Sequence, residues 1–212
     1  MGVVTTSRKE KAAETEAALK EAAKRVFAER GYLNTKITDI TREAGRAAGS
    51  FYNHFAGKEE LLEALLADLS AAGDASAELP EHSPDFTDPA AVRWHIAAYW
   101  RFYRQNAATL VALRQAAMVS DDFARTLARF GAREQADVAS HLAHIVRAGM
   151  RLPAEPETTI AMMFGMVDSF AQLWLVPPRP EGWRELSDDE AIDALTRFVY
   201  RGLTGRDPEG GY

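Results

Sequence analysis

The sequence predicts an all-α protein of about nine helices, and three observations lead to this fold class. Apolar residues recur at the three- and four-residue spacing of a helix in most segments of the 212-residue chain. No segment shows the sustained alternation of β-branched and polar residues that marks a strand. Glycine, proline and helix-capping residues separate the apolar segments, so most helices can be placed.

The first helix is expected over residues 14–30, because its apolar side chains share one face. Gly31 follows, where a glycine commonly ends a helix. Thr35 is a candidate N-cap for a short second helix, Asp39 suits its first turn, and Gly45 ends it. The apolar residues of the first helix are Leu19, Ala22, Ala23, Val26 and Phe27.

A third short helix is expected near residues 47–55 and a fourth over 58–71, with Gly57 between them. The stretch that follows, 72–89, is rich in Ala, Ser, Pro, Asp and Glu, which indicates a linker. The sequence therefore predicts two domains. They cover residues 1–71, including the start of a connecting helix, and residues 72–212.

The second domain is expected to open with a helix rich in aromatic residues. Asp88 and Pro89 fit an N-cap followed by a proline at the first helical position. Ser120, followed by two aspartates, opens another helix that is expected to run through residue 130 toward 150 without a break.

Two more helices complete the second domain. Pro153 and Pro156 are expected to break the chain before an apolar helix around residues 158–176. Polar residues dilute that run, so we predict a buried core or interface helix rather than a membrane span. Ser187 and Glu190, three residues apart, form a capping box ahead of the last apolar stripe.

The composition bounds the cellular setting. The chain contains no cysteine, which excludes disulfides, zinc–thiolate sites and a cysteine nucleophile and fits a reducing cytosol. The basic residues Arg8, Lys9 and Lys11 are followed by no apolar segment, so no signal peptide is expected. We therefore expect a cytoplasmic protein with no membrane partner.

The net charge of −6 argues against a nucleic-acid partner, but the distribution of charge reverses this impression. Residues 1–58 hold eleven Lys and Arg against seven Asp and Glu, whereas residues 59–212 hold fourteen against twenty-four. Attraction to phosphate acts over about a Debye length, so the local sign matters more than the total. A basic N-terminal segment followed by an acidic remainder fits a DNA-binding domain, although chance asymmetry also produces such a pattern.

The basic N-terminal segment contains a predicted helix-turn-helix. The second helix, the turn at Gly45 and the third helix form the unit, and the first helix supports it from behind. The major groove, about 12 Å wide, admits one α-helix. Gly49 carries no side chain, so the backbone can approach a phosphate there. Lys58 would meet the phosphate backbone beside the amide groups that open the fourth helix.

The stretch AGRAAGSFYNHFAGKEELL (44–62) resembles the DNA-binding motif of the tetracycline-repressor (TetR/AcrR) family of bacterial regulators. The pattern of that family reads roughly A-G-V-S-x-G-x-[LF]-Y-x-H-F-x-x-K-E-x-L. The preceding RVFAERGYLNTKITDI also resembles the family, so the resemblance covers about residues 15–66. The residues that match the pattern without a gap are Ala44, Gly45, Gly49, Phe51, Tyr52, His54, Phe55, Lys58, Glu59 and Leu61.

The resemblance implies a repressor that binds a near-palindromic operator as a homodimer and is released by a small molecule. The second domain would bind that ligand and would dimerise through the last two helices. Two residues depart from the pattern. Arg46 replaces an apolar residue, and Ala47 replaces a serine that caps the recognition helix, at a cost of about 1 kcal/mol. Arg46 either contacts a phosphate or a guanine, or is simply solvated at the turn.

Candidate site residues follow from this interpretation. Phe51 and Phe55, four residues apart, are expected to pack inward. The predicted DNA-binding residues are Thr38, Arg46, Ala48, Gly49, Ser50, Tyr52, Asn53, His54 and Lys58. Aromatic and methionine side chains of the second domain would line an apolar pocket for a hydrophobic or aromatic ligand, or else form ordinary core and dimer interface. The predicted ligand-binding residues are Trp94, Tyr103, Met118, Met163, Val167 and Trp174.

No metal or other cofactor is predicted. Asp137, His141 and His144 share one helical face at a spacing that could hold a metal, but the sequence offers no fourth ligand. Asp168 is a lone acid in an apolar helix, so it needs a partner if buried, and Arg147 or Arg197 is a candidate.

Two other functional classes compete with a DNA-binding regulator. A helical enzyme is disfavoured, because the sequence has no glycine-rich phosphate loop, no nucleophile-and-base signature and no convincing metal set. A protein-interaction module that uses DNA as a platform is the other alternative. Homodimerisation has support of its own, because the 158–176 run and the stripe after Ser187 carry more apolar surface than an isolated domain would leave exposed.

Overall fold

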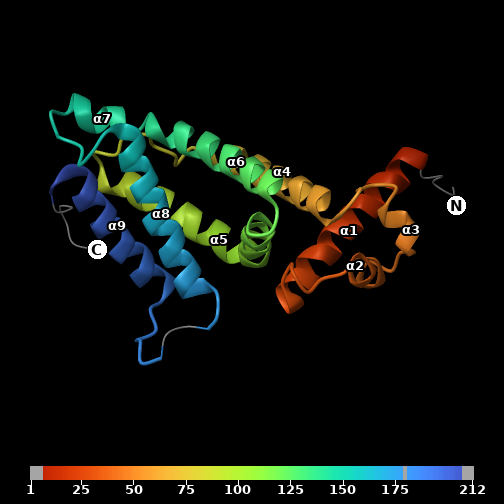
Figure 1. Cartoon of the computed structure of the whole chain (residues 1–212). Coiled ribbons are helices and arrows are strands. Elements are labelled where there is room, and N and C mark those ends of the chain that lie inside the picture. The colour runs from red at the N-terminus through yellow and green to blue at the C-terminus, as the bar shows by residue number, and fades with distance from the viewer. Residues whose placement is uncertain (1–6, 179–180, 207–212) are drawn as a thin grey trace, which may run out of the picture. The chain divides into compact units, whose positions relative to one another are not determined.

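The computed structural model describes residues 7–178 and 181–206, and within these ranges it consists of helices and connecting loops, without strands (Figure 1). The predicted all-α fold class is confirmed. None of the helices in the described part of the chain is both long enough and apolar enough to span a bilayer. The helices are α1 (Arg8–Arg30), α2 (Ile37–Glu43), α3 (Ala48–Phe51), α4 (Lys58–Ala77), α5 (Pro89–Ala117), α6 (Asp121–Ala139), α7 (Leu142–Arg147), α8 (Pro156–Leu175) and α9 (Asp188–Thr204).

The chain divides into two compact units. The first comprises residues up to Ala72 together with Ala108–Leu127, and the second comprises Gly73–Ala107 and the residues from Ala128 onward. The last third of α5 and the start of α6 therefore belong with the N-terminal helices. The expected domain boundary near residue 71 stays a prediction, because the first unit combines segments from both sides of that boundary.

The core of the first unit forms around one face of α1. Its apolar stripe is buried, and α1 packs with α2, which in turn packs with α3. Phe51 and Phe55 are buried as well. The helix begins at Arg8, six residues before the predicted start. Ser7 and Glu10 form a capping box there, in which the Ser7 hydroxyl oxygen accepts from the Glu10 N–H at 3.2 Å.

The turn between α2 and α3 is closed by backbone hydrogen bonds. The Arg46 N–H donates to the Thr41 carbonyl at 2.9 Å, and the Gly45 N–H donates to the Arg42 carbonyl at 3.1 Å. This pairing is the Schellman motif, which requires a left-handed residue after the helix, and Gly45 has φ of +63°. Glycine adopts that conformation without steric cost, so the turn depends on it.

Several predicted boundaries in the first unit and its connecting helix are wrong. Thr35 does not cap α2, because its hydroxyl donates to the Gly31 carbonyl at 2.7 Å. Asp39 instead accepts from the Lys36 N–H at 3.0 Å. The third helix ends at Phe51 rather than 55, and α4 continues to Ala77 through residues that were expected to form the linker.

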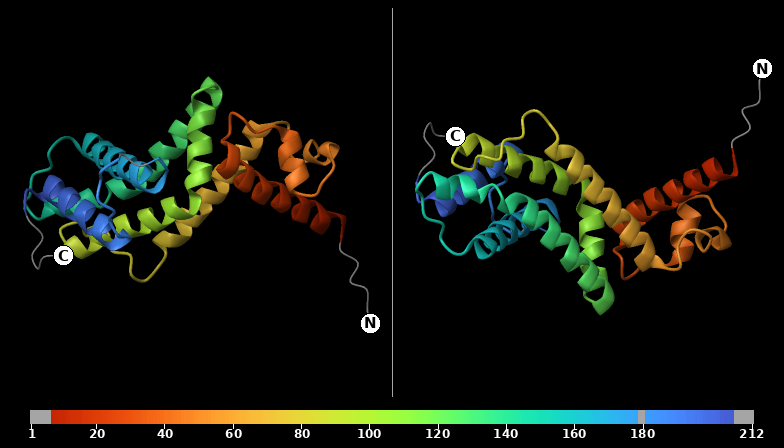
Figure 2. Two further views of the ribbon diagram at one scale, coloured as in Figure 1. Left: turned by 90° about the horizontal axis from the view of Figure 1, so that it is seen from below. Right: turned by 90° about the horizontal axis from the view of Figure 1, so that it is seen from above.

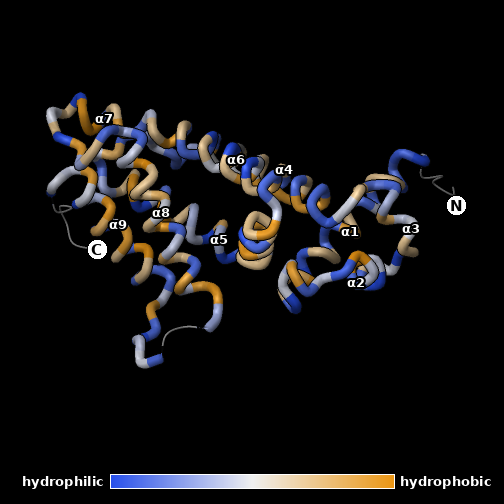
Figure 3. The backbone as a smooth tube through the Cα atoms, in the orientation of Figure 1, coloured by the Kyte–Doolittle hydropathy of each residue, from blue (hydrophilic) through white to orange (hydrophobic). Residues whose placement is uncertain are grey.

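The second unit contains most of α5, all of α7, α8 and α9, and the longer part of α6. In Figures 1 and 2, α8 and α9 lie side by side, and Figure 3 shows hydrophobic and hydrophilic residues alternating along α9. Arg93 and Arg104 of α5 form ion pairs with Asp193 and Asp188 of α9. These pairs fix the two helices against each other.

The helix ends of the second unit match the sequence in part. The Asp88 N-cap is confirmed, because its carboxylate accepts from the Ala90 N–H at 2.8 Å. The capping box of Ser187 and Glu190 is confirmed as well. The predicted long helix toward residue 150 is interrupted at residues 140–141, between α6 and α7. Pro156 does not precede the apolar helix but is its first residue, where a proline needs no N–H.

Candidate nucleic-acid interface

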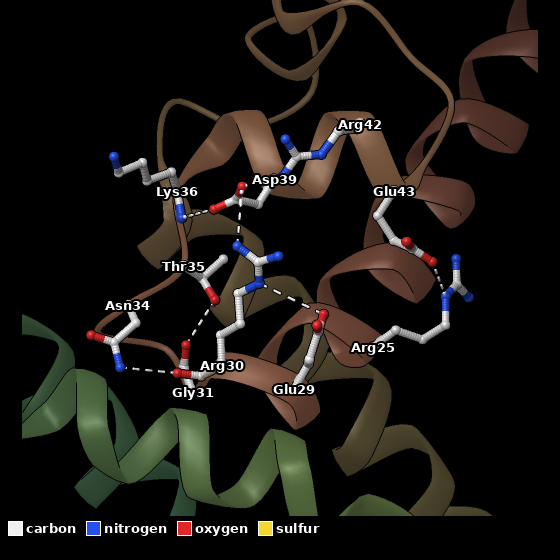
Figure 4. Close-up of polar contacts among 10 residues, drawn as sticks. All are labelled: Arg25, Glu29, Arg30, Gly31, Asn34, Thr35, Lys36, Asp39, Arg42 and Glu43. Carbon is white, nitrogen blue, oxygen red and sulfur yellow. Dashed lines mark hydrogen bonds and ion pairs between the residues drawn. The ribbon is translucent and has the colours of Figure 1, made fainter.

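Ion pairs hold α2 against the end of α1, as Figure 4 shows. Arg25 of α1 donates to Glu43 at 2.6 Å, and Arg30 lies 3.6 Å from the Asp39 carboxylate. The Lys36 N–H and the charges of Arg30 and Arg42 lower the pKa of Asp39, with the backbone hydrogen bond as the largest cause. Apart from Asp39, whose side chain is 12% exposed, these side chains are exposed, so their ion pairs orient α2 more than they stabilise the fold.

The turn between α1 and α2 is held from α4. Lys58 Nζ donates to the Tyr32 carbonyl at 2.8 Å and to the Thr35 carbonyl at 2.6 Å, and it lies 4.2 Å from the centre of the Tyr32 ring. Burial lowers the pKa of Lys58. An ammonium has three N–H donors, and two of them serve this turn. A contact with phosphate through the third stays a prediction.

Two buried aromatic residues orient α3. Phe51 is fully buried and Phe55 almost so, with their ring centroids 5.6 Å apart, as the sequence predicts. Because these anchors face inward, the opposite side of the helix and of the turn after it faces solvent. Tyr52 is 62% exposed there. The other predicted contacts on this surface are Ala48, Gly49 and Asn53, which are exposed, and Ser50, which is half-buried.

Gly49 leaves the backbone of α3 open. A Cβ atom at this position would meet no atom within 4 Å, so the packing of the chain itself does not require a glycine. The backbone conformation does not require one either, since Gly49 is not among the glycines with positive φ. An open glycine on an exposed helix is suited to close approach by a partner surface.

Arg46 and His54 point toward α1 rather than away from it. An Arg46 guanidinium nitrogen lies 3.9 Å from the Glu14 carboxylate, and His54 Nδ1 lies 4.0 Å from that of Glu16. The His54 side chain is only 12% exposed. Both residues therefore support the arrangement of α1 and α3, and their contact with DNA stays a prediction. Thr38, on α2, is exposed beside the surface of α3.

The exposed basic residues of α2 were missed from the sequence. Lys36, directly before α2, is exposed, and the Arg42 side chain is 70% exposed although it pairs with Asp39. The sequence signal for them is the presence of two cations within the segment expected to form the second helix.

The predicted ligand-binding residues are not all brought together. Tyr103, Val167 and Trp174 are buried in the second unit, whereas Trp94 and Met163 are half-buried there. Met118 follows the end of α5, belongs to the first unit and is 82% exposed. Trp174 also belongs to an aromatic series, Trp100, Phe170, Trp174 and Trp183, with successive ring centroids 5.4–6.1 Å apart.

The polar residues that the sequence singles out in the second unit make the following contacts. The Tyr99 hydroxyl donates to the Asp168 carboxylate at 2.6 Å, a partner that the sequence analysis did not consider. Asp137, His141 and His144 do not form a cluster among the described residues, where His141 instead meets His82 and His95. His144 Nδ1 lies 3.8 Å from Asp85.

Comparison with known proteins places this geometry in a family. Residues 19–65 match the family described as bacterial regulatory proteins, tetR family. The chain is 34% identical over 182 residues to the HTH-type transcriptional regulator TtgR of Pseudomonas putida, an alignment that covers 80% of this chain and 84% of TtgR. A second relative, described as probable HTH-type transcriptional regulator ArpR of Pseudomonas putida, is 32% identical over 181 residues, with the same shares covered.

The fold is also that of a solved regulator. A bacterial regulatory protein in the tetR family from Rhodococcus RHA1 has a TM-score of 0.70 and 19% sequence identity, over 90% of this chain and 97% of that one. Members of the family are transcriptional regulators and not enzymes, and the predicted resemblance is confirmed. The helix-turn-helix, the exposed face of α3 and the relatives agree that the chain belongs to the TetR family and is a DNA-binding transcriptional regulator.

Proposed function

We propose that the protein is a cytoplasmic repressor that binds a near-palindromic operator as a homodimer and is released by a small hydrophobic ligand. The observation that carries the DNA-binding part is the exposed surface of α3 and of the turn after it. Tyr52 and Asn53 of that turn are exposed, Gly49 of α3 leaves the backbone open, and Phe51 and Phe55 are buried on the opposite side. A single helix fits the width of the major groove.

The proposed contacts divide into two kinds. Ser50, Tyr52 and Asn53 would read base edges, while Lys36 and Arg42 would meet phosphates, since both are exposed cations at the two ends of α2. Lys58 and the first amide groups of α4 would add a phosphate contact. We assign these contacts to a DNA-binding domain of residues 1–71, and we assign the ligand and the dimer to residues 72–212.

The homodimer is supported by apolar side chains on α8 and α9 that remain exposed in the single chain. Phe198 of α9 is 67% exposed, and Met162 and Leu173 of α8 are exposed as well. Such large apolar side chains on two adjacent helices are expected where a second copy packs. A helix pair from each subunit would then form a four-helix interface.

The ligand proposal rests on the aromatic interior of the second unit. Trp100 is buried, and its indole N–H has no hydrogen-bond partner among the described residues. Because buried donors are nearly always paired, an unpaired one favours a ligand that carries a hydrogen-bond acceptor on an apolar body. Tyr103 and Trp174 would line the same site. The ligand must bind better to the conformation that does not fit DNA, since only differential affinity shifts the equilibrium.

Selection of random duplex DNA on the purified protein tests the function. Enrichment of a near-palindromic site, with half-sites about 34–36 Å apart or a multiple of this spacing, supports a dimeric reader. The selected duplex then serves as the probe in a screen of hydrophobic compounds for release. No enrichment at low as well as moderate salt contradicts operator binding. A compound that tightens DNA binding contradicts release by ligand.

A further inference from the structure

Three of the five histidines of the chain meet in the second unit, although they are far apart in the sequence. His82 comes from the loop after α4, His95 from α5, and His141 from the turn between α6 and α7. One ring nitrogen of each lies within 4.8 Å of a ring nitrogen of the other two. The ring centroids are 5.0–5.3 Å apart. We call these residues the histidine cluster.

Backbone carbonyls orient two of the three imidazoles in the same way. His95 Nδ1 lies 2.9 Å from the Ala91 carbonyl oxygen, and His141 Nδ1 lies 2.9 Å from that of Val138. A carbonyl oxygen can only accept, so Nδ1 carries the proton in this arrangement and the lone pair is on Nε2. A carbonyl that fixes the tautomer of an imidazole in this way is the usual companion of a metal-binding histidine.

Burial lowers the pKa of both of these imidazoles. The pKa of His95 is lowered to about 4, mainly by removal from water and also by the neighbouring histidines, while the hydrogen bond to the Ala91 carbonyl opposes the change. The pKa of His141 is lowered for the same main reason.

Aromatic side chains enclose the histidine cluster. The Phe86 ring stacks on His141 with a centroid distance of 5.1 Å, and Trp94 lies 5.3 Å from His82. Phe86 is almost fully buried, and the Tyr200 hydroxyl of α9 donates to the carbonyl of Thr87 at 3.0 Å. The loop that carries His82 is therefore anchored at its far end, and the cluster has an apolar surround.

We propose that His82, His95 and His141 bind a divalent transition-metal ion, with Zn²⁺ as the expected ion and the fourth coordination position left for water or an external ligand. Zinc–nitrogen bonds place tetrahedral ligand nitrogens about 3.3–3.4 Å apart, so the imidazoles need to approach one another by roughly 1.5 Å at most. No carboxylate joins the cluster among the described residues. The site goes beyond the proposed function and does not depend on it.

Metal binding is tested on the full-length chain without an affinity tag, after treatment with EDTA. Titration with ZnCl₂ in a calorimeter is expected to show one ion bound per chain, and Co²⁺ is expected to give the visible absorption of a tetrahedral site. The variants His82→Ala and His95→Ala are expected to weaken zinc binding by about 100-fold or more. His82 is half-exposed in a loop, so this variant should fold, and circular dichroism checks it.

His144→Ala is the matched control, because His144 is three residues from His141 but lies outside the cluster. It is expected to bind zinc like the unaltered chain. If the unaltered chain binds no zinc at micromolar concentration, or if His82→Ala and His95→Ala both bind it equally well, the cluster is aromatic packing and the proposal is overturned. Loss of binding in His144→Ala alone also overturns it. The selection of duplex DNA is read separately, so failure of either proposal leaves the other intact.

Discussion

The side-chain carbonyl oxygen of Gln115, near the end of α5, accepts a hydrogen bond from the Tyr32 N–H at 2.7 Å. Lys58 of α4 donates to the carbonyl oxygen of the same Tyr32. The turn ahead of the helix-turn-helix is therefore held from α4 and α5 at once. Because α5 also supplies residues to the second unit, this turn is bonded to a helix that both units share.

Replacing Gln115 with alanine should lower the free energy of unfolding by about 1–3 kcal/mol, because the part-buried Tyr32 N–H loses its acceptor. Urea denaturation followed by circular dichroism measures the change. Gln105→Ala on the same helix is the control, since Gln105 is exposed and its loss should stay within about 0.5 kcal/mol. Equal urea midpoints for the two variants would mean that the hydrogen bond between Gln115 and Tyr32 contributes nothing to stability.

The two glycines that flank the start of α3 should respond to alanine in opposite ways. Gly45→Ala should destabilise the protein by about 1–2 kcal/mol, because φ is +63° there. Gly49→Ala should leave stability unchanged or raise it by up to about 1 kcal/mol, since the added methyl meets no atom within 4 Å. Its DNA affinity should nevertheless fall about tenfold or more, equivalent to about 1.4 kcal/mol, because the methyl separates the backbone from the groove.

Urea denaturation and fluorescence anisotropy with the selected duplex distinguish the two effects. A stable Gly49→Ala variant with full DNA affinity would show that DNA does not approach this end of α3. Destabilisation by Gly49→Ala as large as that by Gly45→Ala would instead mean that the glycine is needed by the fold.

Local signals explain how much of this fold could be predicted. Ser187 and Glu190 identify the start of α9 because both partners of the capping box lie within one turn. The same pattern at Ser7 and Glu10 precedes the apolar stripe, which begins at Leu19, by about three turns, so the stripe alone does not mark the start of α1. The break at residues 140–141 contains neither glycine nor proline, so it had no local signal. It coincides with the burial of His141 against Phe86, a contact between distant segments.

The candidate site shows the same limit. The inward position of Phe51 and Phe55 follows from helical spacing, but the pairing of Arg46 with Glu14 depends on how α1 lies beside the turn. The histidine cluster joins residues from three elements. A search along one helical face could find only His141 among its members. Contacts within one helix can be read from spacing, whereas contacts between helices require the packing to be known.

Replacing the exposed Phe198 with aspartate should weaken the homodimer by about 100-fold or more, because a charge on this face would be buried against the partner subunit. Sedimentation velocity over a concentration series measures the change. Leu79→Asp is the control, since Leu79 is also exposed but lies in the loop after α4. A dimeric Phe198→Asp variant would place the interface elsewhere, and an unaltered chain that is monomeric at micromolar concentration would contradict the homodimer.

Substitutions of Lys58 and Lys36 should show which of the two lysines stabilises the fold and which only attracts phosphate. Lys58→Met keeps the apolar stem of the side chain but removes the donors to Tyr32 and Thr35. Its free energy of unfolding should fall by about 1.5–3 kcal/mol, the range for hydrogen bonds to a charged group. Lys36→Ala should leave stability within about 0.5 kcal/mol, because the Lys36 side chain is exposed.

Both lysine variants should lower the salt dependence of DNA binding, because each removes one contact with a phosphate. The slope of log K against log salt should decrease in magnitude by about 0.9 for each contact, equally for specific and unrelated duplexes. Anisotropy titrations between low and moderate salt measure it on protein that is folded by circular dichroism. An unchanged slope in Lys58→Met would assign this lysine to the turn alone. An unchanged slope in Lys36→Ala would remove the start of α2 from the phosphate contacts.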